Sequence, residues 1–400
     1  MVDGRPLAPF HPLQSDEDAP LDALMAARVQ ATLAWGQLQG KLSHVPRQVA
    51  HHFCAALVRL MLIEALAQSG FSGAEGWFSA WFSGLAPVPD VTTQITAPAA
   101  LVADTLLSEL SLSTWEPLGQ ATAQIRAAAR FDQDRHHAEP EIPPAFAVEE
   151  ATRLSESLAL GPEENWPLAA LDRLHDAAAG SPHFAPVERN RQLLALPSGP
   201  MVFEQARSAM PLWALDLVAG RLIAQSNPGS PPLPLPGTVR AEALRPELWP
   251  RERAILVAEA AGNAARRVSE QLDAAYARVQ VMQAAISRLR STSRAPHLYR
   301  LLAGFGPLRP LQIEQALGVS KNGARDLVAA LVKAGLAETT APRHQAVIRA
   351  LPPPRTYNVP AAEDDVSADS PYAEHDAIMA DIDRLLARAN ASCRGNDLDE

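Results

Sequence analysis

Three polar residues near the C-terminal end of the chain are spaced to contact a double helix. Lys321, Asn322 and Arg325 begin a stretch in which apolar residues recur every three or four positions. A helix there would turn these three side chains outward. Lysine and arginine can contact guanine edges or phosphates, and asparagine can contact adenine. The set therefore predicts contacts to DNA bases in a major groove.

The helix that carries these residues is expected from about Lys321 to Ala334. Ser320 is a suitable N-cap, because its hydroxyl can accept a hydrogen bond from a free backbone N–H. Two shorter helices are expected before it, at about Pro296–Ala303 and Pro310–Leu317. Gly318 fits the left-handed position that closes the second of them. This order indicates a helix-turn-helix whose last helix would enter the groove.

Two short strands are expected after the last helix, over Leu336–Thr340 and Gln345–Ala350, with a basic loop at 341–344 between them. Residues 292–351 are thus predicted to form a winged helix-turn-helix with a small β-hairpin as the wing. Helix ends and wings in such modules contact the DNA backbone. The residues expected to do so are Arg294, Arg300, Ser320, Arg343, His344 and Arg349.

The charge distribution favours a polyanionic partner. Residues 285–356 hold 11 Lys or Arg and 3 acids, a net charge of +8 in a chain of net charge −10. A basic segment in an acidic protein is typical of a local site for nucleic acid. The acidity of the remainder argues against unspecific coating of DNA, so we expect one localised contact with double-stranded DNA.

Composition predicts a mostly α protein. The 400 residues are 47% hydrophobic but only 5% aromatic, and Ala and Leu dominate. Cys54 and Cys393 lie far apart and are expected to be free thiols in a reducing compartment. The polar N-terminus does not fit a signal peptide, and no run of 18 apolar residues is present. We therefore expect a cytoplasmic protein with no membrane contact.

Proline-rich stretches and charge divide the chain into six expected parts. These are a disordered N-terminus (1–20), a multi-helix N-terminal domain (21–225), a Pro-rich connection (226–248), a long linker helix (249–291), the winged helix-turn-helix (292–351) and an acidic tail with a short amphipathic helix (352–400). The tail either keeps the protein soluble or folds over the basic winged helix and competes with DNA.

The expected linker helix carries a heptad pattern. The 4-3 spacing runs through Val268, Leu272, Ala275, Val279, Met282, Ile286 and Leu289. This pattern either joins two chains in a homodimer through residues 265–290, or packs within one chain against the helical domain. A dimer would present two DNA-binding units to a two-fold symmetric site.

No catalytic or metal site is expected. The pairs His51-His52 and His136-His137 are adjacent in sequence, whereas helical metal ligands are spaced by three or four residues. Phosphate-binding glycine loops, the GxSxG elbow and the HExxH motif are absent from the sequence. We expect no cofactor, no metal and no enzyme activity.

The run RLRSTSRAPHLYRLLAGFGPLRPLQIEQALGVSKNGARDLVAALVKAGLAE, with WALDLVAGRLIAQ upstream, resembles a family of uncharacterised helix-turn-helix proteins of rhizobia and related alphaproteobacteria, often plasmid-borne. The resemblance covers about residues 205–350 and implies the fold and DNA binding. The order of parts also resembles the back half of Fic-type nucleotidyl transferases. Their His-Pro-Phe start and Gly-Asn-Gly-Arg loop are missing here, and His183-Phe184 lacks the glycines that would bind phosphate.

These features together predict a sequence-specific DNA-binding protein, a transcriptional regulator. The alternative is a helical scaffold for protein–protein interaction, in which the winged helix is a packing module.

Overall fold

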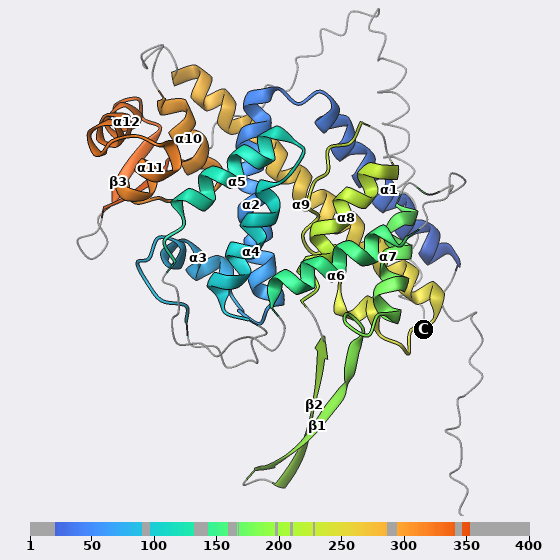
Figure 1. Cartoon of the computed structure of the whole chain (residues 1–400). Coiled ribbons are helices and arrows are strands. Elements are labelled where there is room, and N and C mark those ends of the chain that lie inside the picture. The colour runs from blue at the N-terminus through green and yellow to red at the C-terminus, as the bar shows by residue number, and fades with distance from the viewer. Residues whose placement is uncertain are drawn as a thin grey trace, which may run out of the picture. The chain divides into compact units, whose positions relative to one another are not determined.

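The computed structural model describes residues 21–89, 97–131, 143–158, 166, 168–196, 199–208, 211–226, 229–285, 294–340 and 346–352. The expected disordered N-terminus, the His136-His137 pair, the wing loop and nearly all of the acidic tail lie outside these residues. The described chain is mostly helical, as composition predicted, and it holds two antiparallel two-stranded sheets (Figure 1).

In chain order the elements are α1 (Leu21–Ser43), α2 (Arg47–Gln68), α3 (Ala74–Phe82), α4 (Ala99–Ser111), α5 (Glu116–Ala128), α6 (Pro144–Glu156), α7 (Ala169–Gly180), β1 (Pro186–Leu196), β2 (Gly199–Ser208), α8 (Trp213–Ser226), the 3₁₀ helix η1 (Ala241–Leu244), α9 (Pro250–Ala285), α10 (Ala295–Gly304), α11 (Pro310–Leu317), α12 (Lys321–Lys333), β3 (Ala337–Thr340) and β4 (Val347–Ala350).

Helix α2 is the central helix of the core. It is apolar on most sides, and α3, α4, α5, α8, α9 and α10 all contact it. By length and composition α2 would also qualify as a membrane span, but 78% of the qualifying window is buried inside the protein. A helix that is hydrophobic all round is stable only where every side is covered. The other helices supply that cover.

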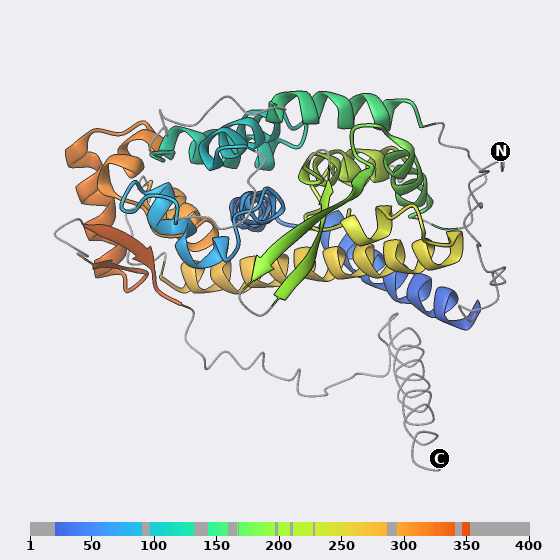
Figure 2. The same cartoon turned by 90° about the horizontal axis from the view of Figure 1, so that it is seen from below.

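Helix α9 packs on both α1 and α2, and it passes beside α1 in Figure 2. The heptad residues that the structure describes, from Val268 to Met282, are at most 4% exposed, so the seam packs within the chain. The prediction of a homodimer through residues 265–290 is therefore wrong for this face. Both α1 and α2 pack on α9, and α2 contacts it along this stretch, where Arg267 and Gln283 bind Glu64 and Gln48. Ile286 and Leu289 lie outside the described residues.

The Pro-rich segment after α8 is part of the core rather than a connection between domains. Its residues Leu233, Leu235 and Val239 are buried, and the chain forms one compact unit up to Leu351. Asp216 of α8 accepts hydrogen bonds from the backbone N–H groups of Gly237, at 2.7 Å, and Val239, at 2.8 Å. The prolines thus shape a buried extended segment whose polar backbone is satisfied by one carboxylate.

A long β-hairpin lies between α7 and α8, inside the stretch 21–225 for which only helices were predicted. Strands β1 and β2 pair antiparallel from Leu196–Gly199 at the turn to Pro186–Ser208 at the base. The register shifts once, between Val187 and Asn190. The sequence signal for this hairpin is Pro-Ser-Gly-Pro between two apolar runs, which is typical of a turn between strands.

Gly220→Ala tests whether the Pro-rich segment packs as described. A Cβ at this position in α8 would lie 1.3 Å from the carbonyl oxygen of Leu233, which is backbone and cannot swing away. We expect a loss of roughly 3 kcal/mol in the free energy of unfolding, measured by urea denaturation. The matched control is Gly76→Ala in α3, where a Cβ meets nothing within 4 Å. It should be neutral or stabilising by up to about 1 kcal/mol. Equal stability of the two variants would contradict the packing.

Candidate nucleic-acid interface

Residues 294–352 form a C-terminal module of three short helices and one hairpin. Helix α12 contacts α10, α11 and β3, and β3 pairs antiparallel with β4. Leu308, in the segment before α11, exchanges two backbone hydrogen bonds with Ile348 of β4, of 3.0 and 2.9 Å. These contacts tie the helices to the hairpin and fix the direction of α12.

Local sequence signals determine where α12 begins. Gly318 has φ of 60° and closes α11 in the left-handed region, as predicted. The hydroxyl of Ser320 accepts a hydrogen bond of 3.2 Å from the N–H of Gly323, which confirms the predicted N-cap. On the inner face Ala324 and Leu331 are buried. The helix is therefore held by its cap and by a narrow apolar stripe.

Lys321, Asn322 and Arg325 lie together on the outer surface of the first two turns of α12. All three are exposed, and within the described part of the chain none of them makes a hydrogen bond or ion pair. Lys321 and Arg325 are one helical turn apart, about 6 Å along the axis. The positive end of the helix dipole adds to their charge. The structure thus brings the three predicted base-contacting residues together.

Arg300 is not on this surface, contrary to the prediction. Its exposed fraction is 8%, and its Nη2 donates to Gln124 Oε1 of α5 at 3.3 Å. The reason is that α10 is covered on every side, whereas its leucine pattern indicated a single buried face. A phosphate could reach Arg300 only if the module left the body, so Arg300 is a residue of the packing interface.

The other predicted phosphate-contacting residues have different environments. Arg294 is exposed and donates weakly to the carbonyl of Leu317 at 3.4 Å. Arg349 is also exposed but is bound to Glu338, its partner across the hairpin. Ser320 is exposed and occupied as the N-cap. Arg343 and His344 lie outside the described residues. Arg294 is thus the least engaged of the predicted phosphate-contacting cations that can be placed.

The module is fixed to the helical body through α10 and α11. Gln312 is fully buried, and its Nε2 donates to the carbonyls of Phe82 and Ala128, at 3.2 and 2.8 Å. Its Oε1 accepts from the N–H of Arg309 at 2.9 Å. Phe305 packs edge-on against Phe82, with ring centroids 4.7 Å apart. These contacts leave α12 on the outer side of α10 and α11 (Figure 1).

Two buried histidines, His51 and His52, lie near Arg300 where α10 meets α2. Burial first and the charge of Arg300 second lower the pKa of His52 to about 3, and the same two causes lower the pKa of His51 to about 4. Neither ring nitrogen of His52 has a hydrogen-bond partner, and its ring lies edge-on to Tyr299. At neutral pH both histidines are therefore uncharged and act as packing groups.

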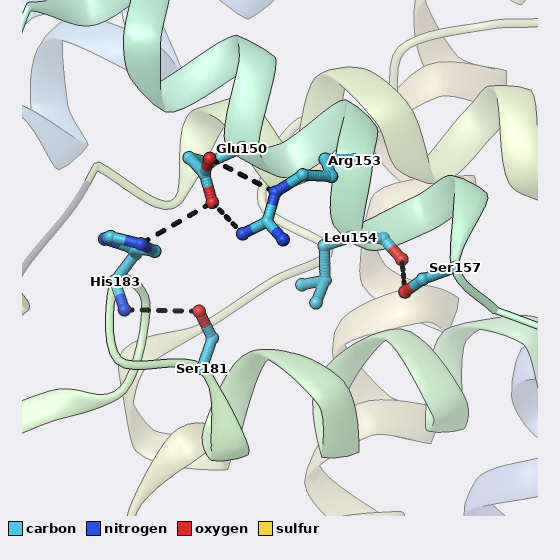
Figure 3. A network of polar contacts seen from close by, with 6 residues as sticks. All are labelled: Glu150, Arg153, Leu154, Ser157, Ser181 and His183. Atoms are coloured by element: carbon cyan, nitrogen blue, oxygen red, sulfur yellow. Dashed lines mark hydrogen bonds and ion pairs between the residues drawn. The ribbon is translucent and has the colours of Figure 1, made fainter.

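The second polar cluster of interest surrounds His183 (Figure 3). Its Nε2 lies 3.6 Å from a carboxylate oxygen of Glu150, and Arg153 binds both oxygens of that carboxylate. The hydrogen bond from Arg153 lowers the pKa of Glu150. The backbone N–H of His183 is held by the hydroxyl of Ser181 at 3.2 Å. A carboxylate so engaged is poorly placed to act as a base, and the cluster serves to fix the turn before β1.

A cavity of about 250 Å³ lies between α4, α8 and the Pro-rich segment. Its lining is mainly leucine and proline, with the hydroxyls of Ser113 and Thr114 and the pair Glu109–Arg221, whose charged atoms are 3.9 Å apart. The converging polar groups of a catalytic site are missing from this lining. Within the described residues, no group of three or more potential metal ligands is present either.

Comparison with known proteins adds no family: no family model matches the chain, and no curated protein is significantly similar to it. The α12 surface is therefore the feature of the molecule from which a function is inferred.

Gln312→Leu tests the attachment of the module. The substitution removes the amide from the carbonyl of Ala128 and the N–H of Arg309, and leaves the carbonyl of Phe82 with only the N–H of Arg130, so we expect a loss of roughly 3 kcal/mol in the free energy of unfolding. Amide hydrogen exchange should increase most in α10 and α11. The neighbouring exposed Leu311 offers the control, since Leu311→Gln should change stability by less than about 0.5 kcal/mol. Unchanged exchange in α10 and α11 would show that the module is held differently.

His52→Phe tests the buried histidine. Because the folded-state pKa of His52 is about 3 and the ordinary value is 6.5, only the unfolded chain binds the proton between these values. The contribution of His52 to stability is thus lost as pH falls below 6.5. The variant should be more stable than the parent at pH 7, and its advantage should grow by about 1.4 kcal/mol per pH unit below 6.5. Thermal unfolding at several pH values measures this, and a constant difference would refute the assignment.

Proposed function

We propose that the C-terminal module is a winged helix-turn-helix that binds double-stranded DNA, with α12 as the recognition helix. The observation that carries the proposal is the outer surface of α12. Lys321, Asn322 and Arg325 project from the N-terminal turns of a helix that is held only from its other side. The N-terminal residues of a recognition helix are those that reach base edges.

The dimensions of the module support this role. Helix α12 has 13 residues, a length of about 20 Å, and a major groove about 12 Å wide admits one helix. Hairpin β3–β4, with Leu308 bridged to Ile348, takes the place of the wing. Arg294 is exposed near the start of α10 and is the best-placed residue for a phosphate.

Charge on α12 supports the same partner. Of its charged residues, Lys321, Arg325 and Lys333 are exposed and basic, and Asp326 is the single acid. Arg349 and Glu338 neutralise each other on the hairpin, so Arg349 would contribute less to phosphate binding than Arg294. Binding through Lys321, Asn322 and Arg325 would select particular bases, which is the property of a transcriptional regulator.

A protein-binding scaffold is the alternative, and two exposed apolar residues favour it. Leu311 of α11 and Val332 of α12 are both exposed on the module, and exposed apolar groups often mark protein contacts. The packing of α10 and α11 on the body is also a structural role in itself. The two functions differ in whether the exposed cations of α12 are needed.

Arg325→Ala tests the DNA proposal. A preferred site is first selected from random double-stranded DNA with the full chain, and binding is then measured by fluorescence anisotropy at several salt concentrations. We expect Arg325→Ala to weaken binding to the selected site by roughly 1–3 kcal/mol and to relax preference at the base it contacts. Arg294→Ala should weaken binding to all sequences and reduce the slope of log K against log salt by about 1.

The matched control for both variants is Arg240→Ala. Arg240 is exposed and precedes η1, which packs on α7 and α9 rather than on the module. It should bind DNA as the parent does. If the parent chain bound no DNA at low salt, the proposal would fail and the scaffold would take its place.

A further inference from the structure

Helix α1 is apolar on two opposite faces. The inner face packs along α9 and buries Ala31, Trp35 and Leu38. The outer face exposes Met25 by 53%, Val29 by 58% and Leu33 by 42%. Helices at a protein surface usually turn one apolar face inward and a polar face outward. The second apolar face of α1 therefore requires an explanation that packing on α9 does not give.

The outer face has the spacing of a helix-pairing seam. Ala26, Val29, Leu33, Gly36 and Gly40 follow one another at intervals of three, four, three and four residues, and all five are exposed. This is the spacing by which one helix presents a continuous stripe to another. In α9 the same spacing packs within the chain, whereas in α1 no other described residue covers it.

Charge is nearly absent from this outer face. Among the exposed residues of α1, Asp22 alone is charged. Arg28 and Lys41 turn toward the body, where they bind Asp172 and Asp273, at 3.0 and 2.8 Å. A solvated helix face is normally rich in charge, so this face has the composition of a contact surface.

Packing within the described residues does not require glycine at Gly36 or Gly40. A Cβ at either position would meet nothing within 4 Å, in contrast to Gly262, where the missing Cβ makes room for α1. Glycine inside a helix is less favourable than alanine. Its advantage is that another backbone can approach closely, and here that backbone must come from outside the described residues.

We propose that α1 pairs antiparallel with α1 of a second copy of this chain, about a two-fold axis between Thr32 and Leu33. On the outer face the large residues lie toward the start of α1 and the glycines toward its end. In such a pair Val29 lies over the partner's Gly36, Met25 lies over the partner's Gly40, and Leu33 meets its own copy beside the axis. Every large side chain thus faces a small residue or the axis.

The polar residues at the two ends fit the same arrangement. Counting from the axis between Thr32 and Leu33, Asp22 lies opposite the exposed Ser43 of the other copy and one residue from the exposed His44, so it faces no carboxylate. A parallel pair would instead set Asp22 against Asp22, Val29 against Val29 and glycine against glycine. In a parallel pair the two aspartates would repel each other, and the facing glycines would leave a gap. Self-complementarity of this kind is what a two-fold interface needs, and it identifies the occupant as the same chain.

The proposal does not rest on DNA binding, and its test is the oligomeric state of the full chain. Sedimentation equilibrium should show a concentration-dependent dimer. Leu33→Glu places two carboxylates at the axis and should weaken the dimer roughly 100-fold or more. Leu112→Glu is the control, because Leu112 is exposed by 75% at the end of α4, outside the seam. That variant should dimerise as the parent does.

Gly36→Leu separates pairing from folding. Its side chain meets open space within the chain, and leucine is a better helix former than glycine, so thermal stability should be equal or higher. The same side chain would occupy the place of Val29 from the other copy. We expect the dissociation constant of the dimer to rise at least about 10-fold. A dimer of unchanged affinity would place the interface elsewhere.

Disulfide cross-linking of the full chain, with Cys393→Ser to remove the second thiol, tests the direction of pairing. Cys54 is buried and can remain. Leu33→Cys should cross-link to its own copy. Val29→Cys should not, because its copy lies about 10 Å away along the helix axis. A mixture of Val29→Cys and Gly36→Cys chains should cross-link to each other.

Two results would overturn the proposal. Self-cross-linking of Val29→Cys would show parallel pairing, and a chain that is monomeric at every concentration would show that no second copy covers α1. In that case, shortened chains lacking residues 1–20 or 353–400 would show whether one of those segments is the occupant.

Discussion

The surface of α2 must be covered, and most of the described architecture follows from this requirement. A helix of 22 residues with apolar side chains on most sides cannot turn those sides to water without losing the stabilisation that burial provides. Helices α4, α5 and α9 cover much of its length, and α10 covers the region around His52 and Ala55. The position of the C-terminal module is thus a consequence of the packing of α2, because α10 belongs to both.

The junction between the module and the body combines two kinds of polar burial. Gln312 satisfies its amide fully and fixes α11 to two backbone carbonyls. In the same junction, neither ring nitrogen of His52 has a hydrogen-bond partner, and the ring stays uncharged at neutral pH near Arg300 and Arg278. The hydrogen bonds of Gln312 specify one orientation of the module on the body. Burial of an uncharged histidine makes the junction less stable in acid, where the unfolded chain binds a proton. Gln312 therefore fixes the geometry of the junction, and His52 makes the stability of the junction sensitive to acid.

Local signals in the sequence predicted local structure well. The cap at Ser320, the left-handed Gly318 and the outward placement of Lys321, Asn322 and Arg325 all depend on neighbours within one or two turns, and the structure has them as expected. The mostly helical fold followed from composition in the same way. Such features depend little on what the rest of the chain does.

Features that depend on distant neighbours could not be predicted in the same way. A heptad pattern predicts that a helix face is covered but does not identify what covers it, and in α9 the covering helices are α1 and α2 of the same chain. Arg300 was predicted to be exposed because the leucines of α10 indicate one buried face. In the structure α2 and α5 also cover the side of α10 that carries Arg300. The Pro-rich segment was predicted to be a connection between domains. The sequence does not show that the carboxylate of Asp216 accepts hydrogen bonds from the backbone of this segment inside the core.

The module is attached to the body through two helices. In a pair of such chains, this attachment would limit the separations that the two modules could adopt on DNA. A module on a flexible linker explores many separations, and its effective concentration at a second site changes gradually with distance. Here α10 and α11 are packed into the body, so the separation between the two modules of a symmetric pair would be set by the protein alone. Such a pair would accept two half-sites at one spacing and on one face of the double helix, and would discriminate against the insertion of a single base pair.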